Sequence, residues 1–204
     1  MKIKVVTVVG TRPELIRLSE IIKKFDKNFE HTLIYTNQNY DIKLKNIFIS
    51  ELGIRKPNYE LRLKNKSSLS FIGDMILKVE KILIKEKPDA FFVLGDTNSC
   101  LSALVAKKLK IPIFHYEAGN RCFDNRVPEE INRKIIDNLS DINLTYSDFA
   151  KQNLLVESFK NDRVIKVGSP LKEVFLANKT KINNSNILKK LKLKKNQYIL
   201  VSYH

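Results

Sequence analysis

The feature that most constrains the fold is a regular alternation of short apolar runs with amphipathic stretches. Runs rich in β-branched and apolar residues indicate buried strands at 3–9, 31–36, 90–95, 111–119, 142–147 and 163–170. Between these runs, apolar residues recur at helical spacing, as in the helix that opens at Pro13 and the helix over 72–87. Strands that alternate with helices in this way predict an α/β fold, a doubly wound parallel sheet with helices on both faces.

The alternation weakens after Pro170, where the chain becomes polar. KTKINNSN (179–186) is typical of a linker, a short helical pattern follows, and QYILVSYH has the pattern of a new strand. We therefore expect one α/β domain over 1–170, a linker with a short helix over 171–196, and over 197–204 the first strand of a second domain that this chain lacks.

The large net charge of the chain does not by itself identify a binding partner. The chain has 37 Lys and Arg against 22 Asp and Glu, a net charge of +15, which attracts nucleic acid, anionic lipid or phosphorylated metabolites. The lysines are spread along helical segments such as VEKILIKEK, which favours solvated helix faces over a binding patch. We find no bilayer-spanning apolar run, no signal-peptide pattern and no metal-ligand spacing of the two cysteines, and expect a cytoplasmic protein without membrane or nucleic-acid partners.

Polar clusters follow the predicted strands: GTRPE, GDTNS and HYEAGNR end the first, third and fourth of them. Ligands of open α/β sheets bind beyond the carboxyl ends of the strands, so these clusters are expected to line one site. In GTRPE, Thr11 can cap the following helix, and Arg12 stands beside a helix N-terminus that favours an anion. The alternative is a capped helix with an ordinary surface arginine.

Several carboxylates are candidates for acid/base chemistry, each with a plainer alternative. Asp96 either caps the next helix or is catalytic, and Glu117 at a sheet edge requires a cation, for which we expect Arg121 or Arg126. Glu129 and Glu130 lie in the first turn of a helix opened by Pro128, where the helix dipole favours carboxylates, so capping explains one of them.

The histidines, and the absence of two common catalytic motifs, limit the reactions that this chain could catalyse. We expect His31 at the surface, His115 in the core and His204 at a break between domains. No His, Cys or carboxylate pair has zinc spacing, and there is no G-x-S-x-G nucleophile elbow. Carboxylates, arginines and one histidine suit metal-free proton abstraction or elimination next to a phosphate leaving group.

GTRPE, GDTNS, H-x-EAG-x-R, PEE-x-NR and a final V-S-x-H, in this order, resemble the non-hydrolysing UDP-N-acetylglucosamine 2-epimerase family along the whole chain. The resemblance implies the Rossmann-like N-terminal domain of a glycosyltransferase-B-like two-domain fold. It implies a C2 proton transfer with elimination of UDP, a glycal intermediate and re-addition of UDP, for surface polysaccharide such as capsule or O-antigen. GTRPELIR, QNYDI and EAGNRCFDNRVPEE are similar to the branch that makes UDP-N-acetyl-L-fucosamine from UDP-2-acetamido-2,6-dideoxy-L-talose.

The resemblance also implies roles for individual residues. By motif, the catalytic set is Asp96, Glu117, Glu129 and His204. The substrate-binding set is Arg12, Arg17, Arg121, Asn132 and Arg133, with Arg17 in place of a family lysine. It implies a UDP-sugar substrate, a homodimer, and neither a cofactor nor a metal. QNYD departs from the motif associated with allosteric control, so the resemblance does not carry that control over to this chain.

Three other interpretations remain open from sequence. A glycosyltransferase-like nucleotide-sugar enzyme would share the fold, although PEE-x-NR argues against it, and the chain alone is equally read as an inactive nucleotide-sugar-binding fragment. A nucleic-acid-binding module would account for the charge of +15, but the sequence has no tryptophan, no basic motif and no stacked aromatic pattern.

Overall fold

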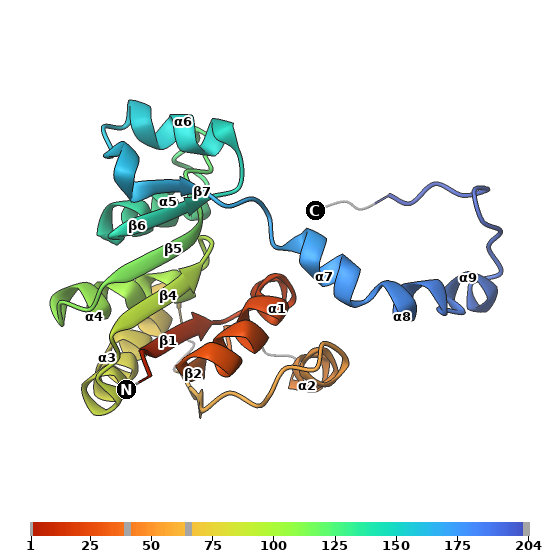
Figure 1. Cartoon of the computed structure of the whole chain (residues 1–204), viewed down its shortest axis with the longest axis horizontal. Coiled ribbons are helices and arrows are strands. Elements are labelled where there is room, and N and C mark those ends of the chain that lie inside the picture. The colour runs from red at the N-terminus through yellow and green to blue at the C-terminus, as the bar shows by residue number, and fades with distance from the viewer. Residues whose placement is uncertain (1, 39–41, 64–66, 202–204) are drawn as a thin grey trace.

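A computed structural model describes residues 2–38, 42–63 and 67–201 of the chain. Its central feature is a seven-stranded sheet in the order β3-β2-β1-β4-β5-β6-β7, with every neighbouring pair parallel (Figure 1). The strands are β1 (Lys4–Val9), β2 (Glu30–Tyr35), β3 (Tyr59–Glu60), β4 (Ala90–Leu94), β5 (Ile113–Ala118), β6 (Ile142–Thr145) and β7 (Val164–Lys166). The predicted parallel, doubly wound α/β sheet is confirmed.

Helices connect the strands. They are α1 (Arg12–Asn28), α2 (Ile42–Glu51), α3 (Ser68–Glu86), the 3-10 turn η1 (Asn98–Ser102) with α4 (Ala103–Lys108), α5 (Pro128–Leu139), α6 (Asp148–Val156) and the 3-10 turn η2 (Asn161–Arg163). The short edge strand β3 and helix α2 were not predicted from sequence. No helix in the described ranges is both long and apolar enough to cross a lipid bilayer.

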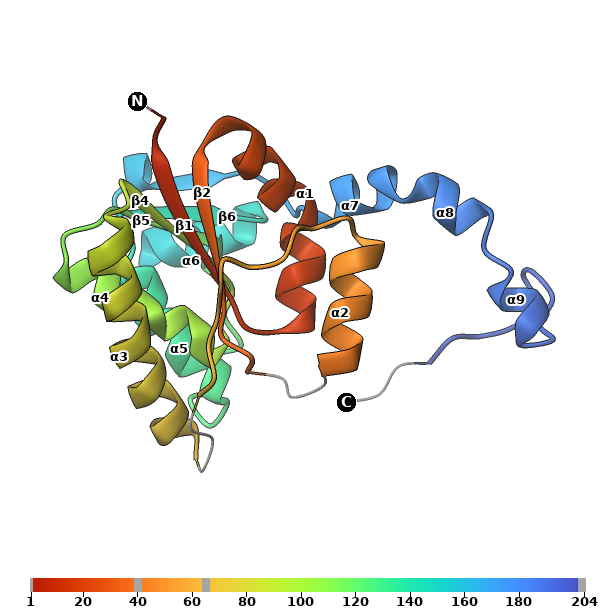
Figure 2. The same cartoon turned by 90° about the horizontal axis from the view of Figure 1, so that it is seen from below.

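Two cores lie on opposite faces of the sheet, as a doubly wound fold requires. On one face, α3, α4 and α5 pack on alternate strand residues such as Val6, Phe91 and Ile113. On the other face, α1 packs through Leu15 and Leu18. The two faces are separate in Figure 2, where α3, α4 and α5 lie opposite α1 and α2. Buried apolar residues on both sides explain why the strands read as continuous apolar runs.

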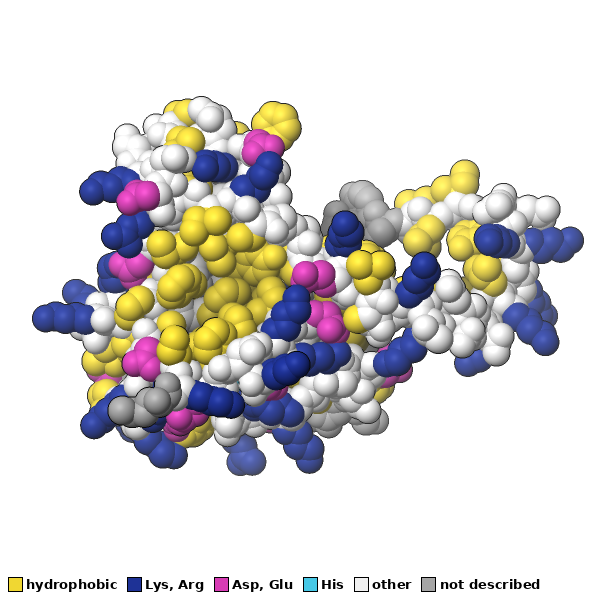
Figure 3. Space-filling model, in the orientation of Figure 1, with side chains coloured by type: hydrophobic (Ala, Val, Ile, Leu, Met, Phe, Trp, Pro, Cys, Tyr) yellow, Lys and Arg dark blue, Asp and Glu magenta, His cyan; other side chains and the backbone are white. Residues whose placement is uncertain are grey.

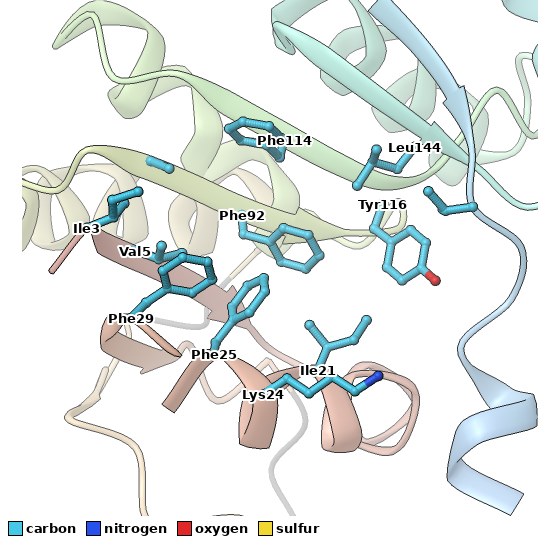
Figure 4. Close-up of a pocket in the computed structure, with 12 residues that line it drawn as sticks. Ile3, Val5, Ile21, Lys24, Phe25, Phe29, Phe92, Phe114, Tyr116 and Leu144 are labelled. Carbon is cyan, nitrogen blue, oxygen red and sulfur yellow. The ribbon is translucent and has the colours of Figure 1, made fainter. Parts of the chain in front are cut away.

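The face that carries α1 is only partly covered. Beside α1, an apolar trough of about 470 Å³ opens over β1, β4, β5 and β6, and it is visible as the yellow hollow in Figure 3. Figure 4 shows aromatic rings from the sheet and from α1 facing one another across it. They include Phe25, Phe92, Phe114 and Tyr116, and Lys24 lies at the rim.

The last part of the chain extends away from the sheet (Figure 1). It forms α7 (Leu171–Ala177), which contacts α1, followed by α8 (Lys179–Asn183) and α9 (Ile187–Lys190). The expected strand over 197–204 does not form in its described part, because residues 198–201 pair with no other strand and Ile199 is 90% exposed. A strand is stable only beside a partner, and this segment lies beyond the edge of the sheet.

Candidate active site

The polar clusters predicted at the strand ends lie along the carboxyl edge of the sheet, where parallel α/β sheets bind ligands. The loop after β1 carries Gly10, Thr11 and the start of α1, and the loop after β4 carries Asp96 and Thr97. Thr97 donates to Glu14 of α1 over 2.6 Å, so the two loops are joined directly. Gly10 permits this approach, because a Cβ there would lie 1.9 Å from the Ser99 hydroxyl.

Glu117 occupies an unusual position at the end of β5. Its φ is +77°, and the pairing of β5 with β6 shifts register at this residue, so the side chain is turned out of the strand pattern. Its carboxylate forms an ion pair with Arg17 of α1 and accepts from Asn120 over 3.4 Å. Burial raises the pKa of Glu117, and Arg17 opposes that rise.

The prediction that Arg121 or Arg126 pairs with Glu117 is wrong. Arg126 is exposed and binds Asp124, with 2.7 Å between its Nη2 and the Asp124 Oδ2. Arg121 points into the domain, where its fully buried side chain binds Asp137 at 2.8 Å and Glu157 at 2.6 Å. Arg17 comes from a helix a hundred residues earlier in the chain, so local spacing gave no indication of it. Burial of Arg121 also argues against its expected role in substrate binding.

Asp96 is held by the helix that follows the next strand. Its Oδ2 accepts from Arg133 Nε over 2.7 Å, and Asn132 donates to the Asp96 carbonyl over 2.8 Å. The helix after β4 is capped by Thr97, whose hydroxyl accepts from Ser99, so Asp96 is not the cap. Two consecutive residues of the PEE-x-NR motif in α5 thus hold the GDTNS loop in place by hydrogen bonds.

The two glutamates at the start of α5 have different environments. Glu130 is buried and accepts from the backbone N–H groups of Cys122 and Phe123 and from Arg133. Burial acts to raise the pKa of Glu130, but these hydrogen bonds outweigh it and the pKa is lowered. Glu129 is exposed at the same edge of the sheet. Glu130 therefore organises the loop, and Glu129 has a side chain accessible to a ligand.

The start of α1 differs from the expected anion site. Glu14 is buried, and its carboxylate accepts from the N–H groups of Gly10 and Thr11, which occupies two donors that a phosphate would need. Thr11 occupies the N-cap position of α1, as predicted, and Glu14 at the third helical position bonds back to the Thr11 N–H as in a capping box, although the buried Thr11 Oγ1 has no hydrogen bond of normal geometry to any described residue. Arg12 is exposed, and its guanidinium lies 5.6 Å from the centroid of the Phe48 ring. An anion here would depend mainly on Arg12.

The histidines are structural where the structure describes them. His115 is in the core as predicted: its Nδ1 lies 2.8 Å from Asp137, and its Nε2 lies 3.0 Å from the Gly95 carbonyl oxygen. His31 is not at the surface, because its buried ring lies between Asp26 and Thr7. His204 lies outside the described residues, as do the last three residues of QNYD. Among the described residues, no three His, Cys, Asp or Glu side chains are grouped so that they could hold a metal.

Sequence reasoning missed one residue of this edge. Tyr146 follows the last residue of β6, and its ring packs edge-on against Tyr116 with 5.2 Å between the ring centroids. Burial raises the pKa of the Tyr146 hydroxyl far above its ordinary value, the negative charge of Glu117 adds to that rise, and the charge of Arg17 opposes it. Its position directly after a strand, in the polar sequence YSD, was the available signal.

Fold and site together define a Rossmann-like domain whose parallel sheet carries carboxylates paired with arginines at its carboxyl edge. The family model described as UDP-N-acetylglucosamine 2-epimerase matches residues 23–204. A UDP-N-acetylglucosamine 2-epimerase homolog of Methanococcus maripaludis is 42% identical over 98% of this chain and 57% of its own length. The chain belongs to the UDP-N-acetylglucosamine 2-epimerase family.

Solved structures agree with this assignment. The UDP-N-acetylglucosamine 2-epimerase from Rickettsia bellii is 52% identical and superimposes with a TM-score of 0.91, covering 97% of this chain and 53% of that one. The enzyme of Methanocaldococcus jannaschii, solved in complex with UDP-GlcNAc and UDP, is 38% identical with a TM-score of 0.87, covering 93% and 53% of the two chains. The chain spans about half the length of the relatives it matches.

Proposed function

We propose that residues 1–204, completed by a second half such as the relatives have, epimerise C2 of a UDP-N-acetylhexosamine. In the forward step a carboxylate takes the C2 proton, the C1–O bond to UDP breaks, and a C1=C2 double bond forms. In the return step a proton is delivered to the opposite face of C2, and an oxygen of the UDP β-phosphate bonds to C1. The sequence of steps is balanced and requires no oxidant or metal.

The Glu117–Arg17 pair is the observation that carries this proposal. A partly buried carboxylate with a raised pKa is suited to take a proton and give it back, because its two protonation states are closer in free energy at working pH. The ion pair with Arg17 holds the carboxylate in one orientation at the strand tip. We assign Glu117 to proton transfer on one face of the sugar.

The remaining roles follow the edge of the sheet. Asp96, oriented by Arg133 and Asn132, and the exposed Glu129 are the groups proposed for proton transfer at the other face. Arg12, exposed at the rim, is proposed to stabilise the negative charge that gathers on the β-phosphate as UDP leaves. His204 is proposed to join the site at the junction of the two halves.

The proposed substrate is either UDP-N-acetylglucosamine, converted to UDP-N-acetylmannosamine, or the 6-deoxy-L-talose analogue, converted to UDP-N-acetyl-L-fucosamine. Products of both kinds are precursors of capsule or O-antigen, and synthesis would take place in the cytoplasm by a homodimer without a cofactor. The proposed domain boundaries are the Rossmann-like domain over 1–170, the linker over 171–196 and the first strand of the second domain over 197–204. This strand would form when the rest of its sheet is present.

The test is deuterium exchange at C2 in D₂O, followed by NMR. The protein is a chimaera that joins residues 1–204 to the second half of the Rickettsia bellii relative, and each of the two UDP-sugars is supplied separately. We expect exchange and epimer formation with one of them. Absence of exchange with both sugars, in a folded chimaera tested beside an active Rickettsia bellii parent, would contradict the proposal.

A further inference from the structure

The loop that carries Asp96 is held by helices from both layers of the fold. From one face of the sheet, α5 binds this loop through Arg133 and Asn132. From the other face, α1 binds it through Glu14, whose Oε1 accepts from the Thr97 hydroxyl over 2.6 Å. The helices α1 and α5 belong to opposite cores, as Figure 2 shows. The residue that follows Asp96 is therefore fixed by a contact that Asp96 itself does not make.

Glu14 joins two loops with its two carboxylate oxygens. Its Oε2 accepts from the N–H groups of Gly10 and Thr11, and its Oε1 accepts from Thr97. The side chain is buried, and burial raises the pKa of Glu14, while the hydrogen bonds from Thr97, Gly10 and Thr11 oppose that rise. A buried carboxylate is costly unless it is hydrogen-bonded. Here the necessary donors come from the loop after β1 and from the loop after β4 together.

The loop after β4 lies directly against Glu117. A Cβ at Gly95, the residue before Asp96, would lie 3.5 Å from the Glu117 Oε2. The Gly95 N–H also donates to the Tyr116 carbonyl oxygen over 2.9 Å, so the two strand ends are aligned at this point. A movement of the loop after β4 would therefore change the separation of the two carboxylates, Asp96 and Glu117, that are proposed for proton transfer.

Thr97 also has a plainer role. As the N-cap of η1, its hydroxyl oxygen accepts from the Ser99 N–H over 3.3 Å. A cap explains the hydroxyl as an acceptor, but it does not explain the proton that the same hydroxyl donates to Glu14. An N-cap requires only an acceptor, so the donated bond between two loops at the carboxyl edge calls for a reason of its own.

We propose that Thr97 and Glu14 are positioning residues for C2 proton transfer: their hydrogen bond fixes the loop after β4 and thereby sets the place of Asp96 relative to Glu117. Neither side chain is proposed to touch the substrate. Catalysis by two acid/base groups depends on their geometry, and a misplacement of about 1 Å can cost about 10²-fold in rate. The inference rests on the proposed function, because it takes the roles of Asp96 and Glu117 from it.

The experiment compares Thr97→Val with Thr97→Ser in the chimaera, with the UDP-sugar that the wild-type chimaera epimerises. Valine has the shape of threonine without the hydroxyl, and serine keeps the hydroxyl. For Thr97→Val we expect C2 exchange at saturating substrate to fall about 10- to 100-fold, because the Asp96 loop loses its bond to α1. The KM for the UDP-sugar and the affinity for UDP should stay close to wild type, since the bonds of Glu14 at the start of α1 remain. Thr97→Ser should restore a rate near that of wild type.

The control is Ser67→Ala, which removes a cap of the same kind from α3. Ser67 accepts from the Ser70 N–H over 3.1 Å, and no residue of α3 belongs to the proposed site. Ser67→Ala and Thr97→Val should both melt lower, since loss of a helix cap costs about 0.5–2 kcal/mol, but only Thr97→Val should lose exchange.

Three results would overturn the inference. If Thr97→Val melts lower but keeps the wild-type exchange rate, Thr97 is an ordinary cap. If Thr97→Ser is as slow as Thr97→Val, the hydroxyl is not the group that matters. If a higher KM accounts for the whole loss, the substitution acts on binding and not on the placement of Asp96.

A second measurement follows the position of Asp96 without requiring activity. The Arg133 Nε–H donates to the Asp96 Oδ2 over 2.7 Å, so its resonance in a ¹⁵N-labelled sample of the 204-residue chain reports on that carboxylate. We expect this resonance to shift in Thr97→Val and to return in Thr97→Ser. An unchanged resonance in Thr97→Val would overturn the inference, because Asp96 would not have moved.

Failure of the proposed function gives a different result. If the wild-type chimaera shows no C2 exchange while the Rickettsia bellii parent is active, the proposed function fails and the inference falls with it. If the wild-type chimaera is active, Glu117→Gln is inactive and Thr97→Val exchanges as fast as wild type, the inference alone is wrong.

Discussion

Arg17 and Glu117 form an ion pair at the carboxyl edge of the sheet. Arg17 lies in the second turn of α1, and Glu117 lies near the end of β5. The pair joins the helix after the first strand to the end of the fifth strand, in addition to the Thr97–Glu14 bond that joins the loops after β1 and β4. Two opposing effects act on the carboxylate: burial raises its pKa, and the guanidinium lowers it. The net pKa of Glu117 is raised, so burial is the stronger effect.

Removal of the cation should therefore raise the pKa of Glu117 further. In Arg17→Met, burial acts unopposed and we expect a higher pKa for this carboxyl group than in wild type. The measurement is a ¹³C NMR titration of the glutamate side chains. Arg126→Met is the matched control, because it removes an exposed arginine bound to Asp124. An unchanged Glu117 titration in Arg17→Met would show that the ion pair is not maintained in solution.

Glu117→Gln should separate stability from activity. A carboxyl group whose folded pKa is raised contributes stability that is fully present below its unfolded value, 4.5, and is lost as pH rises through the folded pKa. Glutamine stays neutral and keeps that contribution. We therefore expect the variant to be more stable than wild type at pH 7, with about 2–4 °C for each kcal/mol, and no more stable below pH 4.5.

The same substitution should remove C2 exchange in the chimaera by about 10²–10⁴-fold, the usual contribution of an acid/base group. Thermal melting from pH 4 to pH 8 and the exchange assay are the two measurements. A variant that melts lower than wild type at pH 7 would mean that the bond to Arg17 matters more than burial. A variant with full exchange would mean that Glu117 transfers no proton.

Adjacent glutamates provide a matched pair. Glu130→Ala leaves two backbone N–H groups of the loop before α5 without an acceptor, which costs about 1–3 kcal/mol, while Glu129→Ala should stay within about 0.5 kcal/mol. Because the pKa of Glu130 is lowered, its contribution is present above pH 4.5 and is lost as pH falls through the folded pKa. Urea unfolding at pH 7 and at pH 3 is the measurement, and equal effects of the two variants at pH 7 would contradict this assignment.

Glu129→Gln tests the other side of that assignment. In the chimaera we expect a fall in C2 exchange of about 10²–10⁴-fold with an unchanged melting temperature, because the side chain is exposed and available to the ligand. Asp96→Asn should also lose exchange. Because this substitution weakens the bond to Arg133, the melting temperature should fall as well. Full exchange in Glu129→Gln would show that Glu129 is a surface carboxylate without a role in proton transfer.

The sequence predicted the sheet well because buried parallel strands are marked by apolar runs and by the polar residues that follow them. It did not predict β3, because Tyr59 and Glu60 form too short a run for the alternation of buried and exposed residues in a strand to be recognised. It placed Asp96, Glu117 and Glu129 at one edge, which the topology explains. It missed the Arg17–Glu117 bond and the buried His31, because both depend on contacts between elements that no spacing along the chain encodes.

Arg12 should matter to turnover and hardly to the fold. It is exposed on the first turn of α1 and stacks on Phe48, a contact worth about 0.5–1 kcal/mol at an exposed site. We expect Arg12→Ala in the chimaera to lower the melting temperature by a few degrees at most, and to reduce the exchange rate more than UDP affinity. Phe48→Leu is the control, since it removes the stacking and keeps the cation. A large loss of stability with unchanged turnover would make Arg12 a structural residue.

The chain of 204 residues by itself should fold but show little or no epimerase activity. It contains the whole parallel sheet with both cores, yet it spans about half of each relative. Circular dichroism and thermal melting test the folding, and C2 exchange tests the activity beside the chimaera at equal concentration. Exchange by the chain alone at a rate near that of the chimaera would show that the first half holds a sufficient site.

The apolar trough beside α1 has a calorimetric consequence. A chain of 204 residues unfolds with a heat-capacity change of about 2.4–3.1 kcal/mol/K when its burial is typical. The aromatic rings along the trough border open solvent in the native state, so part of their surface is hydrated before and after unfolding. We therefore expect a heat-capacity change of unfolding slightly smaller, by roughly 0.1 kcal/mol/K, than that of the same domain with the trough covered. The dependence of folding free energy on temperature is correspondingly flatter, and cooling weakens the fold less than it would in a domain of equal length with both sheet faces covered.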